Sequence, residues 1–206
     1  MNFWIGLILL NIFHNIEVIN KGIPGNNSFD LLSRVQQDVV SYQPDLVIMM
    51  VGTNDFCNDR KFVSPDQYEK NLDQLISLIS QNSSLILLTI LPIEWEKLFQ
   101  RHSRQAYPDD FDILIYRCNK IIKSKRAYCA VIDMNNFFKL AEGWFIDGVH
   151  QTDVATRFMA AVIYQYIVDH FCYFNLRKIV CFGDSITRSC FLKFQYSDYL
   201  SMLLNE

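Results

Sequence analysis

Ser185, His150 and Asp147 are the residues of this 206-residue chain whose side chains could together carry a reaction. A serine hydroxyl becomes a good nucleophile only when a base takes its proton, and the pKa of histidine suits that exchange near neutrality. Asp147 precedes His150 by three residues, so a turn can bring the carboxylate to the far nitrogen of the ring. Taken alone, the Asp/His pair is more typical of a cap on a helix that begins near Thr152.

The local pattern around Ser185 also has two interpretations. The apolar run Ile179–Phe182 stops at Gly183 and is typical of a buried strand, and apolar residues at helical spacing follow over Ile186–Leu204. We therefore expect Ser185 at a strand-to-helix turn, where a helix N-terminus offers free N–H groups to an anion. A serine that only caps the helix would occupy the same place, so this motif leaves capping and catalysis open.

Three further stretches of small and polar residues distinguish these alternatives. They are Asn20–Asn26, Gly52–Asp55 and Asp147–His150. Together with Gly183–Thr187 they resemble the four sequence blocks of the SGNH/GDSL hydrolases, a superfamily of serine esterases and lipases. In that family the Gly-Asp-Ser block normally comes first, whereas here it comes last. The chain therefore resembles a circular permutant of the family.

The resemblance implies roles for particular residues. The triad named above would be catalytic, and the oxyanion would be held by the backbone N–H of Ser185, the backbone N–H of Gly25 and the side-chain amide of Asn54. Gly25 is preferred to Gly22 because it takes the second place in the family's Gly-x-x-Gly-like spacing. Thr53 stands where the family often has a second glycine. Asn54 alone could equally form an Asx turn after a strand.

A physical reason supports this grouping independently of the family name. Gly25, Asn54 and Ser185 each follow an apolar run, and parallel strands place such loops at one edge of a sheet. These residues should therefore converge although they are distant in sequence. Asp55 and Asp184 flank them, but carboxylates and histidines at metal-ligand spacing are too few, so we interpret both as loop-shaping residues and expect no metal.

Strand-like and helix-like segments alternate along the chain. Strands are expected at 16–19, 46–51, 84–91, 128–134 and from 178, and helices at 28–41, 65–81, 111–123, 152–171 and 186–204. An irregular segment with a helical piece is expected at 94–110 and a short connection at 137–143. The alternation predicts one α/β domain over 1–206, a three-layer α/β/α fold with a parallel sheet. The resemblance implies a flavodoxin-like, five-stranded order with the last strand between the first two.

The composition limits the classes of protein that the chain can represent. Half of the residues are hydrophobic and 20% are charged, and the net charge of −3 gives no nucleic-acid footprint. Six cysteines without a C-x-x-C pair do not match a zinc site, and we interpret them as reduced thiols of a cytoplasmic protein. The apolar run Phe3–Phe13 is too short to span a membrane, and we expect it to pack as part of the fold; secretion through a signal peptide or membrane association is the alternative.

We therefore expect a serine hydrolase of small carboxylic esters that needs no cofactor. Two other classes stay open: a binding protein on the same scaffold without turnover, and a flavodoxin-like binder of flavin or nucleotide. Short acyl esters, acetylated sugars, lysophospholipids and thioesters are all possible substrates, and the sequence leaves the oligomeric state open.

Overall fold

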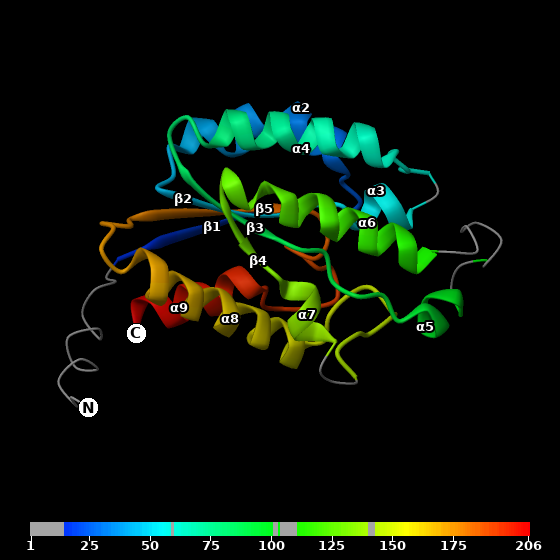
Figure 1. Ribbon diagram of the computed structural model, residues 1–206. Helices are drawn as coiled ribbons and strands as arrows, with labels where there is room; N and C mark the ends of the chain where they lie inside the picture. Colours follow the sequence, from blue (N-terminus) through cyan, green and yellow to red (C-terminus); the bar gives the residue numbers. More distant parts are fainter. Residues whose placement is uncertain (1–14, 59, 101–102, 104–110, 140–142) are drawn as a thin grey trace.

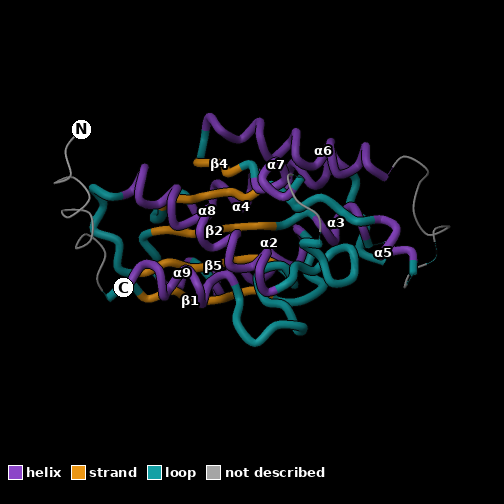
Figure 2. Tube along the Cα trace, turned by 90° about the horizontal axis from the view of Figure 1, so that it is seen from below, coloured by secondary structure: helices purple, strands orange, loops and turns teal. Residues whose placement is uncertain are grey.

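A five-stranded parallel sheet forms the centre of the fold in the computed structural model, which describes residues 15–58, 60–100, 103, 111–139 and 143–206. The strands are β1 (Glu17–Gly22), β2 (Leu46–Met50), β3 (Ser84–Leu88), β4 (Ala130–Ile132) and β5 (Lys178–Gly183). Their order in the sheet is β1-β5-β2-β3-β4, and every neighbouring pair is parallel. Figure 2 shows β5 between β1 and β2, so the expected central place of the last strand is confirmed.

Helices cover both faces of this sheet. They are α2 (Ser28–Asp38), α3 (Thr53–Cys57), α4 (Pro65–Ile79), α5 (Trp95–Phe99), α6 (Phe111–Ser124), α7 (Met134–Phe138), α8 (Asp153–Phe171) and α9 (Tyr196–Asn205), with short 3₁₀ turns at Val40–Tyr42 and Lys125–Ala127. In Figure 1, α2, α4 and α6 lie over one face, whereas α8 and α9 lie over the other. The α/β fold with helices on both sides of a parallel sheet is therefore as expected.

Local sequence explains where the long elements begin. The residues of β2 are all buried, as expected for a strand covered on both faces. Asn27 caps α2 and forms a capping box with Asp30, and Ser64 caps α4 immediately before Pro65. Thr152 caps α8 by accepting a hydrogen bond from a backbone N–H in the first turn.

The helix expected over Ile186–Leu204 is wrong in its first half. After β5 the chain forms a turn and a loop, and α9 begins only at Tyr196. Side chains in the loop bind its backbone: Asp184 accepts from the N–H of Ile186, and Gln195 bonds to backbone groups of Ser189. Such local bonds compete with helical ones, so the apolar spacing alone was misleading.

Several other boundaries differ from expectation. The expected strand at 84–91 ends at Leu88, that at 128–134 is limited to Ala130–Ile132, and the helix from residue 28 ends at Asp38. A short helix, α7, replaces part of the expected connection because Asp133 caps it through the N–H of Asn136. The apolar segment Phe3–Phe13 lies outside the described residues.

The last helix is tied to the residue that precedes β1. The side-chain oxygen of Asn205 accepts from the N–H of Ile16 at 2.9 Å, and its amide donates to the carbonyl of Ile16 at 3.0 Å. Within the described ranges, none of the helices has the length and apolar character that a membrane span requires.

Candidate active site

Three of the sheet's strands end side by side, and the polar blocks start from these ends. Gly22 of β1 and Met50 of β2 are both register partners of Gly183 in β5. The approach is close: a Cβ on Gly183 would lie 2.5 Å from the carbonyl oxygen of Met50, and one on Gly22 would lie 2.6 Å from the backbone nitrogen of Arg188. Glycine is therefore required at both positions, and the expected convergence of the blocks at one edge is confirmed.

Ser185, His150 and Asp147 form a continuous chain of hydrogen bonds. His150 Nε2 lies 3.0 Å from Ser185 Oγ, and His150 Nδ1 lies 2.9 Å from Asp147 Oδ2. Asp147 Oδ1 also accepts from the backbone N–H groups of His150 at 2.8 Å and Val149 at 3.1 Å. The three residues predicted from the sequence thus come together in the arrangement that nucleophilic catalysis requires.

A tight loop holds the Asp/His pair against the turn that carries Ser185. Phe145 and Gln151 pair across its base as an isolated antiparallel bridge, and the N–H of Ile146 donates to the carbonyl of His150 at 2.8 Å. The side-chain amide of Gln151 then donates to the carbonyl of Ile186 at 3.0 Å. Because Thr152 caps α8, the alternative that Asp147 and His150 serve as helix caps does not apply.

The electrostatics of Asp147 determine the tautomer of the imidazole. Burial raises the pKa of Asp147, but hydrogen bonds from the backbone and the ring of His150 outweigh it and hold this pKa below its ordinary value. An ionised carboxylate can only accept, so His150 Nδ1 carries the proton. His150 Nε2 is then left as the acceptor for the hydroxyl of Ser185.

Ser185 itself does not lie at a helix N-terminus, which corrects the expectation of a strand-to-helix turn. It lies in a turn directly after β5 and is 9% exposed, and the residue that caps α9 is Gln195. A capping role for Ser185 is therefore wrong, and the dipole of a following helix does not act on its hydroxyl.

The two other residues expected at the oxyanion site lie in loops next to Ser185. Gly25 has a φ of +79°, a conformation that favours glycine, and within the described part of the chain no atom lies within 4 Å of a Cβ built there. Asn54, in α3, donates from its side-chain amide to the carbonyl of Asn26 at 3.0 Å and to Asp184 Oδ2 at 3.2 Å. Asn54 thus contacts the residues that adjoin Gly25 and Ser185.

Both flanking aspartates are fully buried. Burial raises the pKa of Asp184 to about 7, although the N–H of Ile186 donates to this carboxyl. Burial likewise raises the pKa of Asp55 to about 6, and hydrogen bonds from Ser28 oppose the shift. Their contacts within the loops agree with the loop-shaping role expected for them.

Sequence reasoning missed the buried network around Asp55. Ser28 Oγ donates to Asp55 Oδ1 at 2.5 Å and accepts from the amide of Asn71 at 2.8 Å. Ser28 is a second serine bonded to a carboxyl group, but it is fully buried at the start of α2 and its partners are a carboxyl and an amide. We interpret this trio as a structural link between α2, α3 and α4.

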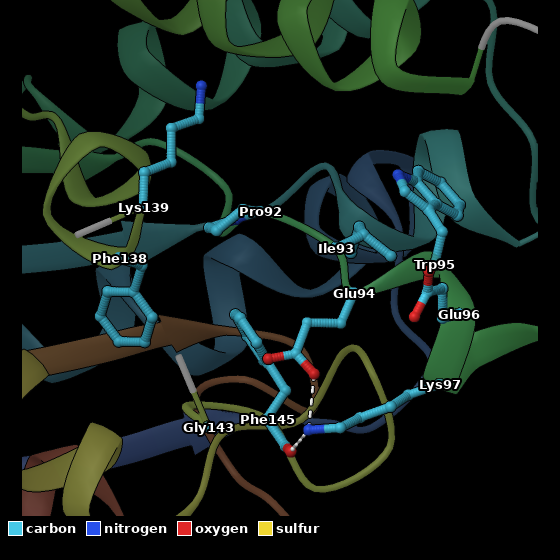
Figure 3. Close-up of a pocket in the computed structure, with 10 residues that line it drawn as sticks. All are labelled: Pro92, Ile93, Glu94, Trp95, Glu96, Lys97, Phe138, Lys139, Gly143 and Phe145. Carbon is cyan, nitrogen blue, oxygen red and sulfur yellow. Dashed lines mark hydrogen bonds and ion pairs between the residues drawn. The ribbon is translucent and has the colours of Figure 1, made fainter. Parts of the chain in front are cut away.

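A cavity of about 530 Å³ lies beside the Asp/His loop (Figure 3). The segment 92–97 forms one wall and Phe138, Lys139, Gly143 and Phe145 line the other, whereas Ser185 and His150 lie outside its described lining. The N–H of Glu94 donates to the carbonyl of Gly148, and Lys97 reaches both Glu94 and the carbonyl of Phe145. Residues 94–97, at the start of the segment expected to be irregular, therefore support the Asp/His loop, and α5 supplies its helical piece; residues 101–102 and 104–110 lie outside the described ranges.

Comparisons with known proteins match the chain to esterases and to a lipase/acylhydrolase. The chain is 40% identical over 68 residues to an acetylxylan esterase of Geobacillus stearothermophilus, a match that covers 30% of this chain and 31% of that protein. It is 24% identical over 164 residues to an arylesterase of Vibrio mimicus, covering 79% and 75%. The crystal structure of the lipase/acylhydrolase from Enterococcus faecalis superposes with a TM-score of 0.61 at 26% identity, covering 72% of this chain and 73% of that one.

The chain thus spans about a third of the acetylxylan esterase that it matches, and three quarters of the arylesterase. A family model described as GDSL-like lipase/acylhydrolase matches residues 9–163, which include Asp147 and His150 and end before Ser185. This match shows the family but not a permuted order. Because it covers most of the chain, the protein belongs to the GDSL-like lipase/acylhydrolase family, a family of carboxylic ester hydrolases.

Proposed function

We propose that the chain hydrolyses carboxylic esters with Ser185 as nucleophile, His150 as general base and Asp147 as the group that orients the imidazole. The observation that carries the proposal is the pair of distances along the triad, 3.0 Å from Ser185 Oγ to His150 Nε2 and 2.9 Å from His150 Nδ1 to Asp147 Oδ2. Both distances are within the range at which a proton passes between heavy atoms.

The reaction would proceed in two halves. As Ser185 Oγ attacks the ester carbonyl, its proton passes to His150 Nε2; the imidazolium then gives that proton to the leaving alkoxide, and an acyl-serine and a free alcohol result. In the second half His150 takes a proton from water, and the hydroxide attacks the acyl-serine. Release of the carboxylic acid restores the proton to Ser185. Asp147 stays ionised throughout and stabilises the imidazolium.

The tetrahedral oxyanion would be held by the N–H of Ser185, the N–H of Gly25 and the amide of Asn54. The amide nitrogen of Asn54 supports this role because it lies within hydrogen-bond distance of groups next to both other donors. Its bond to Asp184 is the longer of the two, at 3.2 Å against 3.0 Å to Asn26. We infer that this bond is the one exchanged when an oxyanion forms.

The test combines turnover with covalent labelling. Ser185→Ala should abolish hydrolysis of p-nitrophenyl acetate and labelling by a fluorophosphonate, while the circular dichroism spectrum stays that of the parent. Ser33→Ala, at an exposed position in α2, is the matched control and should leave both unchanged. Labelling of wild type also separates an active enzyme from a binding protein without turnover. Turnover by pure Ser185→Ala protein at the parental rate would overturn the assignment.

We also infer that 1–206 forms one domain in which the family's blocks run in permuted order. Two observations support this: the strand that leads to Ser185 lies between β1 and β2, and Asn205 is hydrogen-bonded to Ile16 next to β1. A chain with residues 177–206 moved in front of residue 1 should therefore fold and keep ester hydrolysis. A rearranged chain that is unfolded by circular dichroism would contradict the inference.

The names of the relatives suggest a substrate class for this chain. By their names, one relative acts on acetylxylan and another on aryl esters. We infer that this chain takes short acyl esters whose alcohol part is an aryl or carbohydrate group. A cytoplasmic location stays a prediction.

A further inference from the structure

The loop between β5 and α9 places an aromatic ring beside the proposed catalytic base. The rings of Phe191 and His150 lie 5.0 Å apart between centroids, inclined by 54°. Phe191 is nevertheless 44% exposed, so a large part of its side chain remains accessible next to the imidazole. The apolar spacing around this residue had predicted a helix, and the loop is what brings its ring to the site.

The loop holds this position through its own hydrogen bonds. The side-chain oxygen of Gln195 accepts from the N–H of Ser189 at 2.7 Å, and its amide donates to the carbonyls of Ser189 at 3.2 Å and Leu192 at 3.0 Å. The N–H of Phe191 donates to Ser189 Oγ at 3.1 Å. Gln195 is itself held at the start of α9 by a capping box with Asp198. Phe191 thus belongs to a loop whose conformation is stabilised by internal hydrogen bonds.

The chemistry of the reaction determines which part of an ester would meet Phe191. The leaving oxygen takes its proton from His150 Nε2, so it must come within about 3 Å of that nitrogen. The carbonyl oxygen must instead face Gly25 and Asn54. Substituents on the leaving oxygen therefore lie on the imidazole side of the site, within reach of a ring that packs on this imidazole.

We propose that Phe191 is a specificity-determining residue that binds the alcohol part of the ester and selects alcohols with a flat, apolar face. An aryl ring and the C–H face of a pyranose share this chemistry, because both can stack on an aromatic side chain. The inference rests on the proposed hydrolysis at Ser185 and adds the group that the site recognises.

The experiment compares acetate esters that differ only in their alcohol: phenyl acetate, an acetylated methyl xyloside and ethyl acetate. Phe191→Ala should lower kcat/KM for the phenyl or the xyloside ester, relative to ethyl acetate, by about 5- to 10-fold, mainly through KM. Phe194→Ala is the matched control, because this ring belongs to the same loop and packs on Tyr199 at 5.9 Å. This variant should leave the ratios of kcat/KM for the phenyl and xyloside esters to kcat/KM for ethyl acetate at their wild-type values. Phe191→Tyr keeps a flat ring and should restore them.

The outcomes separate the inference from the function on which it rests. A changed ratio for phenyl acetate alone identifies an aryl-binding site, and a changed ratio for the xyloside alone identifies a sugar-binding site. An equal fall in kcat/KM for all three esters would overturn the inference, since Phe191 would then act on His150 rather than on the alcohol. Unchanged ratios, in a variant that a fluorophosphonate still labels, would overturn it as well. Failure of wild type to be labelled would instead reject the proposed function.

Discussion

Replacement of Asp184 by asparagine should change how the stability of the protein depends on pH. Burial raises the pKa of Asp184 from 3.8 to about 7, so between these values the unfolded chain loses a proton that the folded chain keeps. The unfolded state then binds fewer protons, and the free energy of unfolding falls as pH rises across this window. Over the window from pH 3.8 to about 7, at about 1.4 kcal/mol per pH unit, this corresponds to a loss of ~4 kcal/mol.

Asp184→Asn removes this loss because the asparagine cannot ionise. Its single side-chain oxygen cannot serve both Ile186 and Asn54 as the carboxyl does, which costs about 1 kcal/mol at every pH. The variant should thus be less stable than wild type near pH 4 and more stable near pH 8. Between pH 5 and 7 the difference in unfolding free energy should move in the variant's favour by ~3 kcal/mol.

Urea unfolding at pH 5, 6, 7 and 8, followed by tryptophan fluorescence, measures this difference directly. Asp169→Asn is the matched control, since Asp169 is exposed near the end of α8. The unfolding free energy of the control should change with pH in the same way as that of wild type over the whole range. If the unfolding free energy of Asp184→Asn also follows that of wild type with pH, Asp184 is ionised in the folded protein and the reasoning from burial is wrong.

Four further substitutions test other parts of the site and the loops that carry it. Asp147→Asn should lower kcat by about 10⁴-fold with the fold intact, because an amide no longer holds the imidazole in its reactive tautomer; retention of most of kcat would contradict this. Asn54→Ala should lower kcat by about 10²–10³-fold with little change in KM, and a change confined to KM would reject a role in the transition state. Gly52→Ala should lower Tm by several degrees, because φ is +132° and a Cβ would lie 2.6 Å from Cys118 Sγ. Gly25→Ala, where φ is +79° without such a contact in the described chain, should lower Tm less, and equal losses would show that strain alone matters.

The strands were accessible from the sequence for simple physical reasons, whereas the grouping of Ser185 with Asp147 and His150 came from the resemblance. The buried strands are short apolar runs that end at a glycine or a polar residue, as in Leu46–Met50 and Ile179–Phe182. Asp147 and His150 are close in sequence, so a single turn suffices to join them. The position of β5 came from resemblance, because no periodicity reports which strands are neighbours.

The parts that sequence reasoning missed depend on side chains that bind backbone at short range or meet across the fold. Gln195 forms three hydrogen bonds to its own loop, and this prevents the helix that the spacing of Leu192 and Tyr196 indicated. The contacts of Ser28 with Asp55 and Asn71 join three helices, and nothing in their sequence spacing indicates that they meet.

The loop after Ser185 also changes what must stabilise the oxyanion. With α9 starting only at Tyr196, the N-terminus of this helix does not lie at Ser185, so in the proposed mechanism individual donors such as the amide of Asn54 supply the stabilisation. Asp184 lies directly before Ser185, the proposed nucleophile, and is bonded to that amide, and a negative charge there would oppose an oxyanion. Burial that raises the pKa of Asp184 to about 7 weakens this opposition, because the neutral form becomes accessible near neutrality. The same burial that costs stability above pH 4 would therefore favour the transition state of the proposed reaction.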